Sequence, residues 1–150
     1  MFDFLTDMLG QRGSPHLPCL QEILSRKYTI MLAYIAYGDQ LRAEWRDGIY
    51  EHFQEHIKNE RDDIYQLNKK ITALGGDACV TPRAVTSVPL DDTRTVIQAL
   101  LQMEEELVVA WSDLFHKTSD DVALNAMAQN GALADQQHAD DLKRYLRSKG

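Results

Sequence analysis

The sequence predicts an all-α protein in which four helices form a bundle of two antiparallel hairpins joined by a long connection. Three observations lead to this prediction. Apolar residues recur at helical spacing in four segments, and the breaks within each pair of segments are short. The segment between the pairs, residues 77–91, carries Pro82 and Pro89 and has no helical period. About 15 residues can span ~50 Å when extended, which is enough to run the length of such a bundle.

The first helix is expected to begin near Pro18, because proline suits the first turn of a helix. Its apolar stripe starts at Leu20 and continues at spacings of three, four or seven residues as far as Trp45. Residues 1–17 precede it as an N-terminal leader, so the bundle itself is expected to comprise residues 18–150.

The second helix follows a brief interruption at Asp47-Gly48. Its stripe runs from Phe53 to Leu74 and is followed by Gly75-Gly76, a pair typical of a helix C-terminus. These signals place the first hairpin turn close to Gly48.

The third helix begins near Asp91-Asp92-Thr93, whose side chains suit an N-cap, and its stripe runs from Ile97 to Phe115. Residues 118–121 break the pattern and cap a fourth helix, whose stripe ends at Tyr145.

The composition excludes several classes of function. The formal net charge of -7 repels phosphate backbones, so nucleic acid is not an expected partner. No apolar run approaches the ~20 residues that span a bilayer, and the N-terminus lacks the basic and apolar regions of a secretory signal. We therefore expect a cytoplasmic protein with no membrane partner. Cys19 and Cys79 form no metal-binding motif and are expected to be reduced.

Each of the four apolar stripes is interrupted near its middle by an ionisable residue. Buried charges are costly unless they are paired or bind a metal. The interruptions fall at similar depths along all four helices, which predicts that they meet in the core. They are Lys27, Glu60, Glu104, Asp135 and His138.

The same residues repeat with a regular spacing in the two predicted hairpins. Glu60 lies 33 residues after Lys27, and Asp135 lies 31 residues after Glu104. In each hairpin, a second candidate ligand follows the acidic residue of the second helix by three residues, which places both on the same helix face. These two pairs are Glu60-x-x-Asp63 and Asp135-x-x-His138. Four-helix bundles with carboxylate-bridged metal pairs use this arrangement, with one Glu on each of two helices and Glu-x-x-His on each of the others.

Residues 60–76 read ERDDIYQLNKKITALGG, and residues 135–142 read DQQHADDL. The first segment resembles the second helix of the ferritin-like superfamily, bacterioferritin type, where Glu-x-x-His precedes a Leu…Ile…Leu-x-Gly ending. The second is similar to that family's fourth-helix motif, with Asp in place of Glu. Glu104 fits the third-helix carboxylate, and Tyr34 fits an aromatic found near the metals. The resemblance covers about residues 18–147 and implies a ferritin-like four-helix bundle with a long crossover.

The resemblance also implies a di-iron centre, but this chain departs from it at two ligand positions. Lys27 stands where the family has a first-helix Glu, and Asp63 stands where it has a second-helix His. Both changes fall on one metal position, whereas the ligand types of the other survive, in Glu60, Glu104, Asp135 and His138. The carboxylates of Glu60, Asp63, Glu104 and Asp135 together with the Lys27 ammonium carry a net charge of -3, which is close to balance with one divalent or trivalent ion. We therefore expect a variant, degenerate di-iron site with one metal per chain and an ion pair between Lys27 and Asp63 or Glu60.

Iron is the metal that the resemblance implies, although histidine and carboxylate ligands suit Mn and Zn equally. A ferroxidase-like oxidoreductase activity would be weak or altered with Lys27 in one metal position. Haem is not expected, because Arg61 follows Glu60 where the bacterioferritin type uses a nearby Met to bind it. Tyr34 and His56 are candidates for supporting roles beside the metal, although a packed tyrosine and a solvent-facing imidazole are the simpler interpretations.

Several alternatives remain open from the sequence alone. Lys27 could extend to solvent from a slightly misplaced stripe, and Asp63 could flank the core as Asp62 beside it does. Glu60 and Glu104 could lie on solvated faces, and His138 could be a core histidine. The whole site could be a buried ion-pair network in a metal-free structural or interaction protein, or a di-metal or radical oxidase that Lys27 tunes.

The chain is also expected to assemble. Aromatic and aliphatic residues off the inner stripes of the first two helices suit an interface, and a homodimer or larger homo-oligomer is predicted. The candidates are Tyr28, Ile35, Tyr50 and Tyr65.

Overall fold

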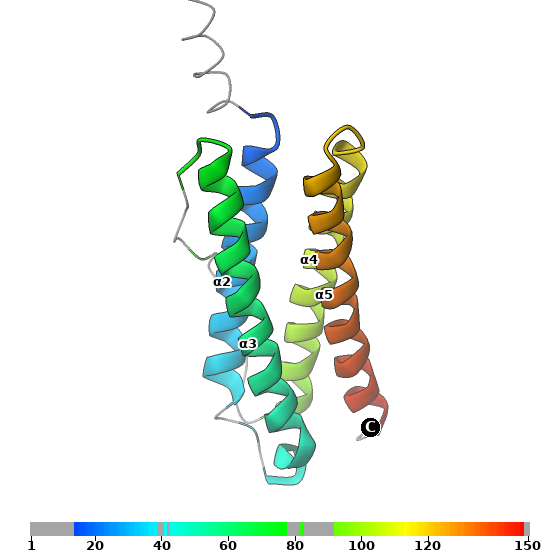
Figure 1. The fold of residues 1–150 in the computed structure, drawn as a ribbon. Coiled ribbons are helices and arrows are strands. Elements are labelled where there is room, and N and C mark those ends of the chain that lie inside the picture. Colours follow the sequence, from blue (N-terminus) through cyan, green and yellow to red (C-terminus); the bar gives the residue numbers. More distant parts are fainter. Residues whose placement is uncertain (1–13, 39–40, 42, 78–81, 83–91, 149–150) are drawn as a thin grey trace, which may run out of the picture.

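The computed structural model describes residues 14–38, 41, 43–77, 82 and 92–148, and within those ranges it consists of four long helices and no strand (Figure 1). The helices are α2 (Leu17–Gly38), α3 (Ala43–Ala73), α4 (Thr93–Lys117) and α5 (Val122–Ser148). The prediction of an all-α four-helix bundle is confirmed. Most of the predicted leader, residues 1–13, lies outside the described residues, and none of the described helices is long and apolar enough to cross a membrane.

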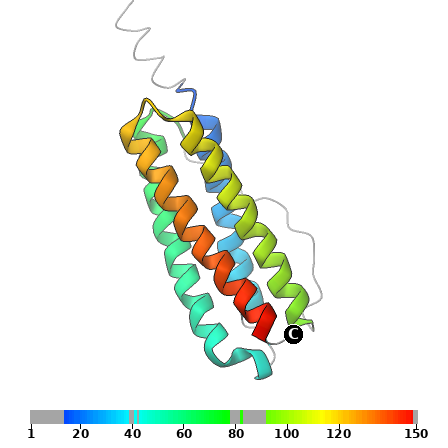
Figure 2. The same cartoon turned by 90° about the vertical axis from the view of Figure 1, so that its right-hand side faces the viewer.

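The four helices pack as two hairpins. α2 lies antiparallel against α3, and α4 lies antiparallel against α5, with α2 also packed on α4 (Figures 1 and 2). α3 ends and α4 begins at opposite ends of the bundle, so these two helices run in the same direction (Figure 1). That arrangement is the one expected of a long crossover, although residues 78–81 and 83–91 themselves lie outside the described part of the chain.

The helix ends use the capping residues that the sequence indicates. At the end of α3, Gly75 has a φ of 84° and its N–H donates to the Thr72 carbonyl, while the Gly76 N–H donates to the Ile71 carbonyl. This is the Schellman arrangement, which places a residue in the left-handed region that glycine tolerates best. At the start of α4, the Asp92 carboxylate accepts hydrogen bonds from both the N–H and the hydroxyl of Thr95.

The boundary between the first two helices differs from the prediction. α2 ends at Gly38 and α3 begins at Ala43, so the turn comes before Trp45 rather than after it. Gly48 has a φ of 81° within the bounds of α3, so the expected interruption is a local distortion inside this helix. Gly38 is buried, and the Leu41 N–H donates to its carbonyl to close the turn. The apolar spacing continues across this turn, which is why periodicity alone placed it wrongly.

Trp111 of α4 packs closely against Gly131 of α5. A Cβ added at Gly131 would come within 2.3 Å of the Trp111 ring. The ring has little freedom to move, because its Nε1–H donates a 2.7 Å hydrogen bond to Asp135 Oδ2 one turn further along α5. Gly131 therefore allows a large aromatic side chain to lie flat against the helix backbone and reach the middle of the bundle.

Gly131→Ala is predicted to lower the free energy of unfolding by about 1–2 kcal/mol. Overpacking costs ~1–3 kcal/mol, and a Cβ within 2.3 Å of a hydrogen-bonded ring belongs in the upper part of that range, at about 2–3 kcal/mol. The ~1 kcal/mol that alanine gains over glycine inside a helix offsets part of this cost. Urea titration followed by circular dichroism measures the change. Asn130→Ala, at an exposed neighbouring position of α5, is the matched control and should stay within ~0.5 kcal/mol of the parent. A Gly131→Ala protein as stable as the control would contradict the packing argument.

Candidate metal centre

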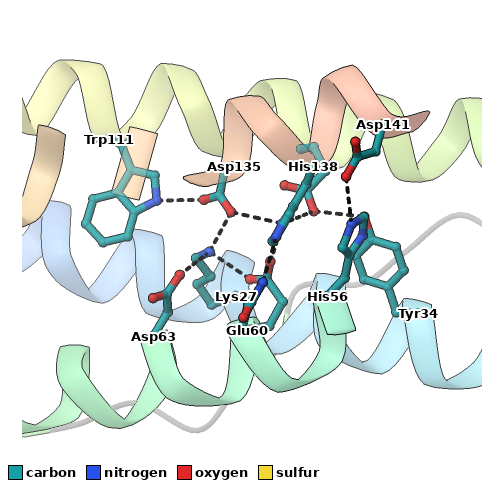
Figure 3. A network of polar contacts seen from close by, with 11 residues as sticks. Lys27, Tyr34, His56, Glu60, Asp63, Trp111, Asp135, His138 and Asp141 are labelled. Carbon is teal, nitrogen blue, oxygen red and sulfur yellow. Dashed lines mark hydrogen bonds and ion pairs between the residues drawn. The ribbon is translucent and has the colours of Figure 1, made fainter. Parts of the chain in front are cut away.

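Midway along the bundle, charged side chains from all four helices meet in the core (Figure 3). Four of them are completely buried and His138 is 4% exposed, so every stripe interruption predicted to lie inside does so. They are Lys27 of α2, Glu60 of α3, Glu104 of α4, and Asp135 and His138 of α5. Asp63 lies at the edge of this cluster, with 33% of its side chain exposed, while Asp62 faces solvent.

Lys27 points inward and its ammonium group is surrounded by carboxylates. Its Nζ lies 2.7 Å from Glu60 Oε2, 2.8 Å from Asp63 Oδ2 and 2.8 Å from Asp135 Oδ1. Burial by itself would lower the lysine pKa, but the carboxylates outweigh it and raise the pKa well above its usual value. Lys27 is therefore a fixed cation, and the alternative in which it extends to solvent is wrong.

On the other side of Glu60 and Asp135, the ring of His138 faces three carboxylates. Its Nδ1 lies 3.2 Å from Glu60 Oε1, 3.3 Å from Glu104 Oε1 and 3.6 Å from Asp135 Oδ1. Two ligands of a tetrahedral metal at 2.0–2.2 Å lie about 3.4 Å from each other. Among the described residues, His138 Nδ1 and Glu60 Oε1 contact each other without the alignment of a hydrogen bond, and Glu104 Oε2 also makes no hydrogen bond. The residues therefore fit a metal ion in chemistry and in spacing.

Glu60 and Asp135 divide the cluster into two halves. Glu60 turns Oε2 toward Lys27 and Oε1 toward His138, and Asp135 Oδ1 faces both side chains. One half is filled by the lysine ammonium, which we call the ammonium half. The other half, bounded by Glu60, Glu104, Asp135 and His138, is called the histidine half; the ligand atoms of these four residues all lie within 4.8 Å of one another.

In the absence of a metal, the histidine half holds protons. Burial raises the pKa of Glu104 to about 8, and the charge of Glu60 adds to the effect. Burial would lower the pKa of His138, but contact with Glu104 and Glu60 outweighs it and raises this pKa to about 10. A divalent ion would replace the positive charge that these protons supply.

Two aromatic residues hold the carboxylates in place. The Tyr34 hydroxyl donates a 2.9 Å hydrogen bond to Glu104 Oε1, and Trp111 donates to Asp135 Oδ2. Tyr34 is completely buried, as a packed tyrosine with one hydrogen bond should be, and burial raises its pKa well above the usual value. Trp111 lies within the apolar stripe predicted from Ile97 to Phe115, and its contact with Asp135 was not predicted. Its position seven residues after Glu104, on the same helix face, was the available signal.

His56 is buried beside this cluster, so the expectation of a solvent-facing imidazole is wrong for it. It is 2% exposed and stacks on His138 with ring centroids 4.0 Å apart. Burial lowers its pKa to about 3, and the neighbouring His138 contributes, so the ring is neutral. Asn59 lies against the far nitrogen of His138 at 3.3 Å. The sequence could not show which way His56 faces, because that depends on how α5 crosses α3.

Comparison with known proteins gives one family match. Residues 19–149 match the family described as ferritin-like domain. A search of curated protein sequences finds no match.

Solved structures share the fold at low sequence identity. A ferritin-like, diiron-carboxylate protein from Bacillus anthracis superposes with a TM-score of 0.81 at 20% identity, over 87% of this chain and 94% of the other. A dodecameric thioferritin, the bacterioferritin-related protein of Bacteroides fragilis, gives 0.81 at 16% identity, over 88% and 84%. The Rhodobacter capsulatus bacterioferritin, described with a metal-free dinuclear site and haem iron, gives 0.79 at 12% identity, over 87% and 82%. These likenesses establish the fold.

The metal-free protein is predicted to lose stability as the pH rises from 6.5 to 8. Both raised pKa values mean that the folded state binds protons more tightly than the unfolded state, so their contribution is lost with rising pH. For Glu104, stability is lost between pH 4.5 and about pH 8, and for His138 it is lost between pH 6.5 and about pH 10. The lowered pKa of His56 acts in the opposite direction, but only between about 3 and 6.5.

Thermal unfolding in chelator at several pH values measures this dependence. Glu104→Gln removes one of the two titrating groups and should make the fall between pH 6.5 and 8 shallower. A metal-free parent protein whose melting temperature rises over this interval would show that the histidine half is not protonated as described.

Proposed function

Because the chain belongs to the ferritin-like domain family, we propose that it is a metal-binding protein that holds one ion per chain in the histidine half of the site. The ligands in this proposal are Glu60, Glu104, Asp135 and His138, with Asp63 held by Lys27 at the edge. The Lys27 ammonium takes the place of a second metal. The observation that carries the proposal is the position of the buried His138 Nδ1, which faces three buried carboxylate oxygens at 3.2–3.6 Å.

The charges of the cluster support one ion rather than two. With a divalent ion bound, four carboxylates, one ammonium and the ion leave one net negative charge. Without it, protonation of Glu104 and His138 beside the other three carboxylates and Lys27 leaves the same net charge. A second divalent ion would have to displace the lysine ammonium, which already contacts three carboxylates within 2.8 Å. The buried cluster is therefore close to electrostatic balance with a single metal.

Iron is the metal we propose, in keeping with the ferritin-like fold, although the ligand types also accept Mn and Zn. Bound iron would supply electrons one at a time. Ferroxidase centres of the di-iron type use two adjacent irons to pass two electrons to oxygen, so a single iron would give weak ferroxidase activity. The chain's own residues hold the site: Tyr34 keeps Glu104 oriented, Trp111 keeps Asp135 oriented, and the surrounding core excludes water.

A second candidate function rests on the ammonium half. The Lys27 ammonium contacts three carboxylates within 2.8 Å, as a buried ion-pair network requires. In that case the bundle would be a metal-free structural or interaction protein. Elemental analysis of the metal bound per chain separates the two candidate functions.

The parent protein is predicted to retain about one equivalent of metal per chain after loading with Fe²⁺ and dialysis against a weak chelator. Lys27→Glu removes the fixed cation and adds a carboxylate, so this variant should retain about two equivalents. Elemental analysis measures both numbers. Lys58→Glu makes the same change of charge at an exposed position of α3 and should retain one equivalent.

Absence of metal from the parent would favour the metal-free network. Two equivalents in the parent would refute the role given to Lys27. Equal occupancy of the Lys27→Glu and Lys58→Glu variants would do the same.

We also propose that the chain forms a homo-oligomer. Leu32 and Ile35 on the outer side of α2 are 47% and 45% exposed, and Tyr65 of α3 is 62% exposed. Exposed apolar and aromatic side chains of this kind are enriched at interfaces. Tyr28 and Tyr50 are half-buried, and Tyr28 receives a hydrogen bond from Asn68, so they offer less free surface. The Bacteroides fragilis neighbour is itself described as dodecameric.

Light scattering after size exclusion should give a dimer or a larger assembly at micromolar concentration. Ile35→Lys should shift the mass toward the 17.1 kDa monomer, because it places a charge in the proposed interface. Val122→Lys, at an 86% exposed position at the start of α5, is the control and should leave the mass unchanged. A monomeric parent protein would contradict the proposal.

A further inference from the structure

A second group of metal-ligating side chains lies beside the histidine half and plays no part in the proposed site. His52 and His56 are one turn apart on the same face of α3, and Asp141 of α5 lies opposite them. One ligand atom from each lies within 4.8 Å of the others. All three line a surface pocket of about 340 Å³, which also reaches His138.

The spacing within this group suits a metal ion better than a hydrogen bond. His56 Nε2 lies 3.6 Å from Asp141 Oδ2, which is too long for a hydrogen bond and close to the ~3.4 Å between two ligands of one tetrahedral metal. Neither ring nitrogen of His56 has a hydrogen-bond partner among the described residues, although this side chain is only 2% exposed. An unpartnered polar group this deeply buried requires an explanation.

Asp141 is oriented by its neighbours in a way that leaves one oxygen available. Its Oδ1 accepts hydrogen bonds from Gln137 Nε2 at 3.2 Å and from Arg144 at 3.0 Å. Its Oδ2 faces His56 (Figure 3). His52 is half-buried and lines the same pocket, with one ring nitrogen within 4.8 Å of the ligand atoms of the other two residues.

Three overlapping sets of ligands lead from this pocket to the centre of the bundle. The outer set is His52, His56 and Asp141; the next is His56, Glu104 and His138; the inner set is the histidine half. Each set shares at least one residue with the next, and the His56 ring stacks on His138 at 4.0 Å. A metal ion passing inward along this route would keep at least one protein ligand at every stage.

We propose that His52, His56 and Asp141 form a second, labile metal site that captures a divalent transition-metal ion from solvent and delivers it to the histidine half. The delivery step rests on the proposed function of the histidine half, whereas binding of an ion at the outer site does not. Two imidazoles and one carboxylate suit Zn²⁺, Co²⁺ or Fe²⁺ and disfavour Mg²⁺ and Ca²⁺, which prefer oxygen ligands.

Co²⁺ titration of the metal-free protein tests the site, with calorimetry to count equivalents. The parent protein should bind one Co²⁺ tightly and a second more weakly, and His52→Ala should lose only the weaker one. Glu104→Gln should lose the tight one and keep the weaker one. His116→Ala removes an exposed histidine of α4 and should bind as the parent does.

In the His52→Ala variant, Co²⁺ should also fill the inner site more slowly. Trp111 contacts the inner ligand Asp135, so quenching of its fluorescence by Co²⁺ reports inner occupancy once Trp45, the other of the two tryptophans, is replaced by Phe. At micromolar Co²⁺, His52→Ala should fill the inner site about tenfold more slowly than His116→Ala while reaching the same final quenching.

The outcomes separate this inference from the proposed function. Equal stoichiometry and equal loading rates in His52→Ala and His116→Ala would overturn the outer site and leave the inner one standing. A parent protein that binds one Co²⁺, lost in His52→Ala and kept in Glu104→Gln, would support the outer site and refute the inner one.

Discussion

The buried ammonium of Lys27 determines what the rest of the core must supply. An ion in a completely buried position pays a desolvation cost of several kcal/mol unless well-placed partners compensate for it. Here the partners come from both hairpins, since Glu60 and Asp63 belong to α3 and Asp135 belongs to α5. Lys27 therefore ties the first hairpin to the second at the middle of the bundle. Removing one member of such a network typically costs about 3–5 kcal/mol.

The same carboxylates that neutralise Lys27 create a need for positive charge on their other side. Glu60 and Asp135 each face His138 as well as the lysine, and Glu104 adds a third acidic group there. Protons meet this need in the metal-free protein, which is why the pKa values of Glu104 and His138 are raised to about 8 and about 10. A metal ion would meet it with ligands already spaced about as a tetrahedral site requires. In our account the cluster is a two-cation site in which one cation is covalently part of the chain.

Much of this arrangement could be predicted from the sequence, because charges that interrupt four apolar stripes at similar depth must either meet or face solvent. That argument identified Lys27 and the buried acids, and the family resemblance added which half of the site Lys27 fills. Periodicity could not find the turn at Gly38, since the apolar spacing continues through it. It could not show that His56 is buried either, because the position of α5 over α3 decides this.

A crystal structure of the iron-loaded protein, with anomalous scattering at the iron edge, tests the central claim most directly. The account predicts one anomalous peak per chain, bounded by Glu60, Glu104, Asp135 and His138, with the Lys27 ammonium still in contact with Glu60 and Asp135. A peak in the ammonium half with Lys27 displaced, or no peak near His138, would contradict it.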